Sequence, residues 1–297
     1  MLTGGRGSKK ILPVYSCLLK DGISRIVALL LLSCGLLARP AFAQSQAPDQ
    51  PEANPGRPTV STPATLTPVG YLQFESGFLG AGDSPGLSSQ YSFNEVVKLS
   101  VSPRLQLLAS AQPVARSTSQ GATANRAGDI SLGAQGVLYQ GEGPRPTLAV
   151  SYFHRVYVGA APDLDIESPA NSFLVLASAD VQGFHYDANA FLSEVVEEPV
   201  RRAQFGQSLS ISHPFFKNFT LSGEIWHFTQ PFLRGSAVGN LWAVSYAARK
   251  NLVFDVGFNH GLTATSTQWE VFAGFTYLLP HRLWGTNGRH HRAGSAP

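Results

Sequence analysis

The sequence predicts an all-β protein, a closed antiparallel transmembrane β-barrel of about 12 strands. Apolar residues alternate with small or polar ones from residue 69 to 279, and no stretch carries a sustained apolar stripe of helical period. The alternating runs are ten to thirteen residues long. A strand that crosses the hydrocarbon layer needs about 9 to 11 residues, whereas strands of soluble proteins mostly have about 5 to 6. Lipid offers no hydrogen bonds, so such a sheet must close on itself.

Residues 1–43 are expected to form a secretory signal peptide. Basic residues, among them Lys9, Lys10, Lys20 and Arg25, precede an apolar run over residues 26–37. Ala41 and Ala43 offer the small side chains that precede a cleavage site. The run is shorter than the roughly 18 residues of a membrane-spanning helix. A competing interpretation makes Cys34 the acylated residue of a lipoprotein signal, in place of cleavage after Ala43.

Two further segments flank the predicted barrel of residues 69–279. Residues 44–68 contain six prolines and almost no large apolar side chain, which predicts an extended, Pro-rich periplasmic leader with no core of its own. Residues 280–297 form a polar C-terminal tail. Outer-membrane barrels usually stop on an aromatic residue that completes the last strand, so this tail departs from the usual signal for the barrel-assembly machinery.

Twelve alternating runs satisfy the even strand number of bacterial outer-membrane barrels. They cover residues 69–79, 89–101, 104–113, 128–140, 146–158, 172–182, 183–195, 202–213, 217–229, 238–249, 251–263 and 268–279. The alternation also assigns faces: Val256 and Phe275 are expected to face lipid, and Gly257 and Thr276 the lumen. Aromatic residues near strand ends fit either interfacial girdles or the filling of a small lumen.

The links between these runs alternate in length for most of the chain. Short links follow the second, sixth and tenth runs, whereas residues 80–88, 114–127, 159–171 and 230–237 make longer ones. Outer-membrane barrels alternate short periplasmic turns with longer external loops, which would place both barrel ends of the chain in the periplasm. Within the first long link, residues 82–86 match the Gly-x-Ser-x-Gly pattern of a serine hydrolase, but they lack the following helix, so we interpret them as a turn.

Several motifs resemble one known family. They are the stretch from Thr67 to Gly77, residues 128–134, residues 145–150, residues 255–263 and residues 269–274. In this order they resemble the meta-pathway of phenol degradation family of putative outer-membrane transporters. The likeness covers about residues 57–279, with the middle matching only in pattern. It implies a barrel that passes aromatic or other small hydrophobic compounds.

Charged residues fall on the polar face, where they would line the lumen. Three of them, Glu75, Asp255 and Glu270, lie on strands that become neighbours when the barrel closes, and they would form an acidic wall that favours cations. The alternative is that the acids pair with Arg155 or Arg202 and plug the barrel. The full set of candidate lumen residues is Glu75, Lys98, Asp129, Arg155, Asp187, Arg202, Glu224, Asp255 and Glu270.

Composition narrows the function classes. Both cysteines precede residue 44, so the exported chain would have no cysteine chemistry. The formal charge of +3 comes from the first 43 residues, which hold six of the 22 Lys/Arg and one of the 19 Asp/Glu, so no nucleic-acid partner is expected. No catalytic residue, cofactor or metal site is predicted.

We therefore expect a bacterial outer-membrane channel or transporter for small, aromatic or hydrophobic molecules. Its expected partners are outer-membrane lipid, the permeant and, during biogenesis, the barrel-assembly machinery. The alternatives are an outer-membrane lipid-modifying enzyme and a plugged barrel with a structural or adhesive role.

Overall fold

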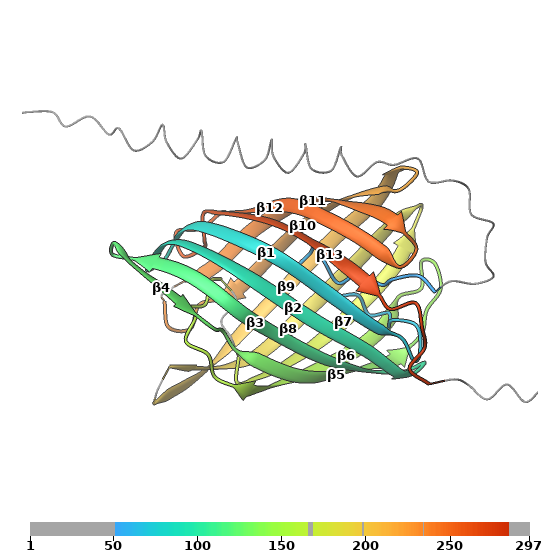
Figure 1. The fold of residues 1–297 in the computed structure, drawn as a ribbon, viewed down its shortest axis with the longest axis horizontal. Coiled ribbons are helices and arrows are strands. Elements are labelled where there is room, and N and C mark those ends of the chain that lie inside the picture. The colour runs from blue at the N-terminus through green and yellow to red at the C-terminus, as the bar shows by residue number, and fades with distance from the viewer. Residues whose placement is uncertain (1–50, 166–168, 198, 234, 285–297) are drawn as a thin grey trace, which may run out of the picture. The chain divides into compact units, whose positions relative to one another are not determined.

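The computed structural model describes residues 51–165, 169–197, 199–233 and 235–284 and shows a closed antiparallel β-barrel (Figure 1). The predicted signal peptide, Cys34 and most of the predicted C-terminal tail lie outside these residues. The strands are β1 (Leu72–Ser84), β2 (Leu87–Ser102), β3 (Leu105–Ser119), β4 (Ala122–Arg126), β5 (Ile130–Tyr139), β6 (Thr147–Tyr157), β7 (Asn171–Val181), β8 (Phe184–Glu197), β9 (Val200–Phe216), β10 (Phe219–Thr229), β11 (Ser236–Arg249), β12 (Leu252–Gly261) and β13 (Trp269–Leu278).

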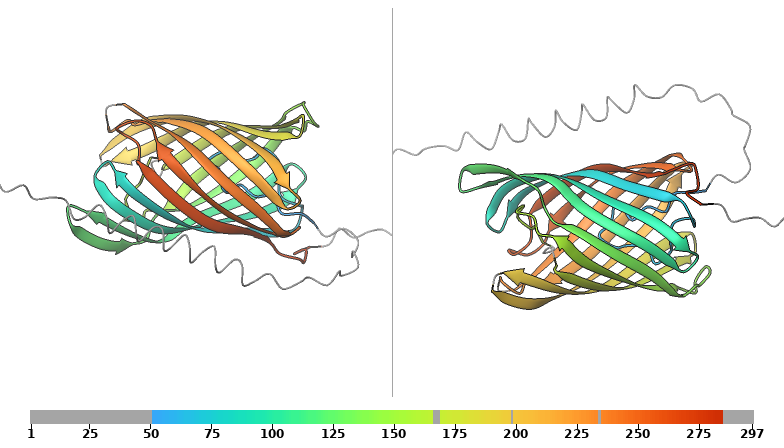
Figure 2. Two further views of the ribbon diagram at one scale, coloured as in Figure 1. Left: turned by 90° about the horizontal axis from the view of Figure 1, so that it is seen from above. Right: turned by 60° about the horizontal axis from the view of Figure 1, so that its bottom comes forward.

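Twelve of these strands make the closed ring, as predicted. Each pairs with its neighbours in the chain, and β1 pairs with both β2 and β13, which closes the sheet. The remaining strand, β4, extends one rim: β3 pairs with β5 over Leu105–Ala111 and with β4 over Ala115–Ser119. The strands run obliquely around the barrel in all views (Figure 2), as closure of a twisted sheet requires.

The two ends of the barrel differ in their links. One end, called the turn end, carries the start of β1, two-residue turns after β2, β7, β9 and β11, and the longer β5–β6 turn of residues 140–146. The other, called the loop end, carries the longer links after β6, β10 and β12. Two predicted long links are wrong. The chain over residues 80–88 continues β1 and β2 as a hairpin, and residues 114–127 hold the end of β3 together with β4.

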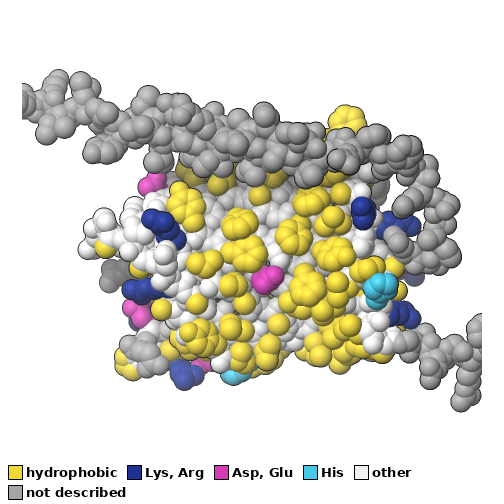
Figure 3. Space-filling view, in the orientation of Figure 1, with side chains coloured by type: hydrophobic (Ala, Val, Ile, Leu, Met, Phe, Trp, Pro, Cys, Tyr) yellow, Lys and Arg dark blue, Asp and Glu magenta, His cyan; other side chains and the backbone are white. Residues whose placement is uncertain are grey.

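The outer face is apolar, and the predicted facing is confirmed. Val256 is 54% exposed and Phe275 37% exposed, whereas Thr276 is fully buried inside the ring. Figure 3 shows apolar side chains over the middle of one face, with Lys and Arg toward both ends. Of the aromatics near strand ends, Phe78, Tyr157, Phe173, Phe184 and Trp269 are exposed on the outer face, whereas Tyr71 and Tyr277 are half-buried. Among the described residues, no helix is long and apolar enough to cross a membrane.

Candidate functional site

The described part of the predicted leader lies inside the barrel. We call residues 51–68 the lumen segment. It begins at the turn end, where Ala53 N donates to Lys250 O at 2.8 Å, and it returns there, where Thr67 N donates to Gln106 Oε1 at 2.9 Å. Between these points Val60 N and Ser61 N both donate to the Glu224 carboxylate at 2.7 Å. The segment is therefore an excursion from the turn end into the lumen, whereas its composition predicted only an extended periplasmic leader outside the barrel.

Side-chain amides of the barrel wall form hydrogen bonds with main-chain N–H and C=O groups of the lumen segment. Gln73 accepts from Asn54 N at 2.9 Å and donates to Asn54 O at 2.7 Å. Asn189 does the same at Thr62, with distances of 2.6 and 3.0 Å. A primary amide carries one donor and one acceptor side by side, so each imitates the edge of a neighbouring strand. Buried main-chain groups need such partners, and a Pro-rich chain cannot provide them itself.

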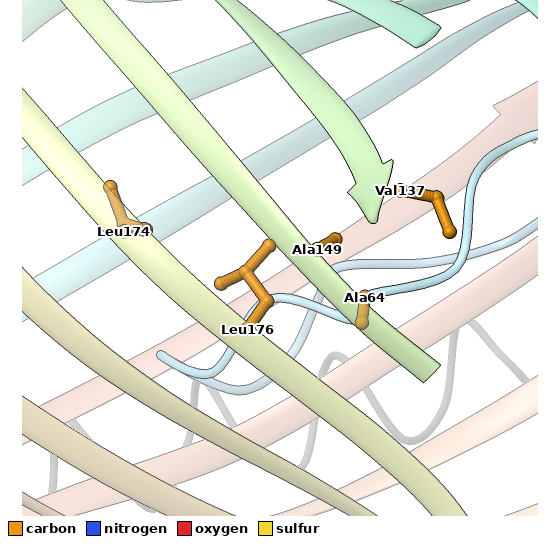
Figure 4. Packing of buried hydrophobic residues seen from close by; sticks show 5 residues of the cluster. All are labelled: Ala64, Val137, Ala149, Leu174 and Leu176. Atoms are coloured by element: carbon orange, nitrogen blue, oxygen red, sulfur yellow. The ribbon is translucent and has the colours of Figure 1, made fainter. Parts of the chain in front are cut away.

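Apolar side chains on the lumen segment and on the strands of the wall pack together. Ala64, which is fully buried, contacts a cluster formed by Val137, Ala149, Leu174 and Leu176. Figure 4 shows these five side chains around the lumen segment, with Ala64 on the segment and the others on the strands. The turn-end half of the lumen is thus a packed core.

A glycine slot holds the guanidinium of Arg57. Arg57 makes two hydrogen bonds to Asp255, at 3.0 and 3.2 Å, in the bidentate arrangement that suits a carboxylate. Asp255 pairs with Gly274 in the strand register, and Gly274 pairs with Gly77. A Cβ at Gly274 would lie 2.7 Å from Arg57 Nε, and one at Gly77 would also overlap the guanidinium. Both positions therefore need to be glycine while Arg57 is docked.

The predicted acidic wall does not form. Asp255 is neutralised by Arg57, and Glu75 by Lys98 at 2.6 Å, with Gly56 N donating to the same Glu75 carboxylate. Glu270 lies apart from both, because it pairs with Asn259, four residues further along β12 than Asp255, or about 13 Å. The neutralising groups also differ from the predicted Arg155 and Arg202, since Arg57 belongs to the lumen segment and Lys98 to β2.

The other predicted lumen residues have separate roles. Asp129 pairs with Arg155 at 2.8 Å and accepts from Gly159 N. Asp187 accepts from Ser178, which in turn accepts from Ala64 N of the lumen segment. Glu224 binds the lumen segment, as described above. Arg202 lies near the loop end, where it donates to Pro231 O and covers the Phe232 ring.

Part of the β6–β7 link folds inward from the loop end and divides the remaining space. Asp165 Oδ1 accepts from Thr267 N at 2.7 Å, and Asp165 O accepts from Gln230 Nε2 at 2.7 Å. Burial raises the pKa of the Asp165 carboxyl, and the bond from Thr267 offsets part of that rise. Asp163 and Leu164 border two cavities, one deeper in the barrel and one at the loop end.

We call the deeper cavity the chamber; its volume is about 410 Å³. It lies between the lumen segment, which contributes Val60, and the inward link, which contributes residues 162–165. On the wall, Trp226 Nε1 donates to Asn259 Oδ1 at 2.8 Å, and Asn259 Nδ2 donates to Glu270 Oε2 at 2.8 Å. These two hydrogen bonds hold the Glu270 carboxylate at the wall of the chamber. The loop-end cavity, of about 420 Å³, is lined in part by Pro85, Glu197 and Phe232.

Enzyme-like and metal-binding features are sparse in the described residues. The Gly-x-Ser-x-Gly pattern of residues 82–86 is the tip of the β1–β2 hairpin, with positive φ at Asp83 and Gly86, so it is a turn. Across the described ranges, no group of three or more His, Cys, Asp or Glu side chains is placed to hold a metal ion.

Sequence reasoning missed Arg57, Asp165 and Gln90, which complete the lumen. Arg57 had a usable signal, because it is the one basic residue in residues 44–68 and the predicted lumen face carries six acids against three bases. Asp165 and Gln90 had none, since one lies in a link and the other is an uncharged residue on an ordinary polar face.

Comparison with known proteins gives matches of structure only. No protein-family model matches the chain, and no curated protein matches it. Among solved structures, an outer membrane channel from Pseudomonas putida F1 superposes with a TM-score of 0.56 at 12% identity, over 77% of this chain and 100% of that one.

Two further structures are more distant. The KdgM porin gives a TM-score of 0.48 at 10% identity, over 69% of this chain and 98% of its own. The translocator domain of the autotransporter NalP from Neisseria meningitidis gives 0.43 at 12% identity, over 71% and 89%. The likeness to the Pseudomonas channel, together with the closed twelve-stranded ring, shows that the chain has the fold of an outer-membrane β-barrel.

Proposed function

We propose that this protein is a channel of the bacterial outer membrane that passes small molecules through its lumen. The observation that carries the proposal is the division of the lumen: two cavities of about 410 and 420 Å³ follow one another from the middle to the loop end, and the turn end is filled by a segment of the chain's own. A barrel with only a structural role has no need for two cavities inside.

The apolar outer face supports a position in lipid, and the fold supports assembly by the barrel-assembly machinery. The resemblance to the phenol meta-pathway family supports a small permeant with apolar or aromatic parts. The chamber walls support it too, because Leu79, Val96 and Trp226 face a cavity at the small end of the range for ligand pockets, which is about 300 to 1,000 Å³.

The lumen segment acts as the closure of the turn end in this proposal. It is bound by hydrogen bonds and ion pairs that can break without disturbing the strand ladder. Removing residues 51–67 would therefore join the chamber to the turn end and leave the twelve-stranded ring intact.

Conductance in planar bilayers tests the proposal. We expect the full exported chain to show small or brief openings and a variant lacking residues 51–67 to show a several-fold larger, steady conductance. Heat-modifiable migration in detergent gels checks that both variants fold. If the folded deletion variant conducts no better than the full chain, the channel proposal fails and the plugged structural barrel is favoured.

A further inference from the structure

We infer that the chamber is a binding site for small organic cations, and that the permeant class is a primary amine carried on a compact apolar body. This inference rests on the proposed channel function for its physiological meaning, but the site itself is argued from the chamber walls. Four observations support it: unmatched hydrogen-bond acceptors, their spacing, the distribution of charge and the apolar remainder of the lining.

The chamber has acceptors without donors. Gln90 is only 2% exposed and lines the chamber, and its Oε1 has no hydrogen-bond partner among the described residues. Asp165, 5% exposed, also lines the chamber, and within the same part of the chain its Oδ2 has no partner. Buried polar atoms without partners are rare in folded proteins because each carries a desolvation cost. A ligand that donates several hydrogen bonds would satisfy both.

The strand register places these acceptors around one space. Gln90 on β2 and Glu270 on β13 are both paired with Ala81 on β1. They therefore lie in one row, two strands apart, at a separation of about 10 Å between their backbones. Ala81 between them carries only a methyl group, and the third acceptor, Asp165, belongs to the inward link that also lines the chamber. An ammonium group, with three donors, fits among three such oxygen-bearing side chains.

The distribution of charge around the chamber also favours a cation. Glu75 and Asp255, outside the chamber, are paired with Lys98 and Arg57, and Asp129, which lines the chamber, is paired with Arg155. The described residues that line the chamber include no Lys or Arg, and the hydrogen bond to the Glu270 carboxylate comes from the neutral Asn259. A bound cation would supply the missing positive charge, whereas an anion would add to the repulsion.

The rest of the lining favours an organic cation over a bare ion. Val60, Leu79, Val96 and Leu164 present apolar surface, and Trp226 offers an aromatic ring. Apolar walls favour ligands with hydrocarbon surface, and the ring of a Trp attracts cations. The walls therefore suit a molecule with one cationic end and one apolar end.

Equilibrium binding to the full exported chain in detergent tests the inference. The probes are benzylammonium, its neutral analogue benzyl alcohol and the anion benzoate, titrated calorimetrically at pH 7. We expect benzylammonium to bind at least tenfold more tightly than benzyl alcohol and benzoate to show no binding. Glu270→Gln is expected to weaken benzylammonium at least tenfold and to leave benzyl alcohol unchanged.

The matched control is Glu142→Gln, which removes an exposed acid in the β5–β6 turn at the opposite end and should not alter binding. If Glu270→Gln fails to fold, Gln90→Leu removes an acceptor without changing charge and should weaken benzylammonium selectively. Equal affinity for the amine and the alcohol, or an equal loss in the control, would overturn the inference.

The two proposals fail separately. A barrel that binds benzylammonium but stays silent in bilayers would contradict the channel and retain the site. A conducting barrel without preference for the amine would retain the channel and reject the site.

Discussion

The two halves of the lumen differ in how their buried carboxylates are neutralised. In the turn-end half, Asp255 and Glu75 are each matched by a cation, and the lumen segment also satisfies wall amides. In the chamber, Asp129 has Arg155, but among the described residues Gln90 Oε1 and Asp165 Oδ2 have no partner and Glu270 accepts from the neutral Asn259. The difference concerns charge and not every polar atom, because Gln135 Oε1 and Thr276 Oγ1 of the turn-end half also lack partners among the described residues. The carboxylates Asp255 and Glu75 are neutralised within the chain, whereas Asp165 and Glu270 have no ion pair among the described residues.

Breaking the Arg57 ion pair should give the largest change in stability. Arg57→Ala leaves Asp255 buried without its cation, and removing one partner of a buried pair costs about 3 to 5 kcal/mol. Urea unfolding of the purified barrel in detergent measures this. The double variant Arg57→Ala with Asp255→Asn should recover most of the loss. Glu270→Gln, which removes an acid that has no cation to lose, should cost much less, and an equal loss there would abolish the contrast between the halves.

Filling the glycine slot should have an intermediate effect. Gly274→Ala puts a methyl group against Arg57 and against Ser76 O, and overpacking of this kind costs about 1 to 3 kcal/mol. Gly82→Ala is the control, since nothing lies within 4 Å of a Cβ there. The same unfolding series measures both variants. If the two substitutions have the same effect, Arg57 does not occupy the slot.

The smallest effect concerns Asp165 and depends on pH. Because burial raises its pKa in the folded protein, the charged form is disfavoured there, and folding stability from this group rises as the pH falls through the raised pKa. Asp165→Asn, which stays neutral, should therefore be more stable than the parent at pH 8 by about 1 kcal/mol, and the gap should narrow toward pH 4. Thermal melting across that range checks it, with Glu142→Gln as control; a gap that widens on acidification would contradict it.

The sequence was most informative where one physical rule acts alone. The expected run 251–263 corresponds to Leu252–Gly261, and 268–279 to Trp269–Leu278, because period-two alternation reflects the contrast between lipid and lumen at every position. The same rule placed Asp255 and Thr276 inside. It was less informative at Gly80, where glycine suggested a loop, although the strand continues there with Tyr91 and Val271 packed close beside it.

The contacts of the site could not be predicted from the alternation of apolar and polar residues. Arg57 and Asp255 are 198 residues apart, and their pairing depends on a register that brings Gly77, Gly274 and Asp255 into one row. The position of the lumen segment also depends on contacts with many strands at once, as with Asn189 on β8 and Gln73 on β1. No single contact of this kind can be recognised in the sequence, because one polar residue on a polar face looks like any other.

The path of the lumen segment has a topological consequence. The excursion starts at Ala53 beside Lys250 and ends at Thr67 beside Gln106, and both points are at the same rim. The described chain therefore enters and leaves the barrel at the same end, as a loop, and is not threaded through the barrel. Such a loop can be withdrawn toward that rim, or reinserted, without any strand pair opening and without any of its residues passing through the opposite end of the barrel.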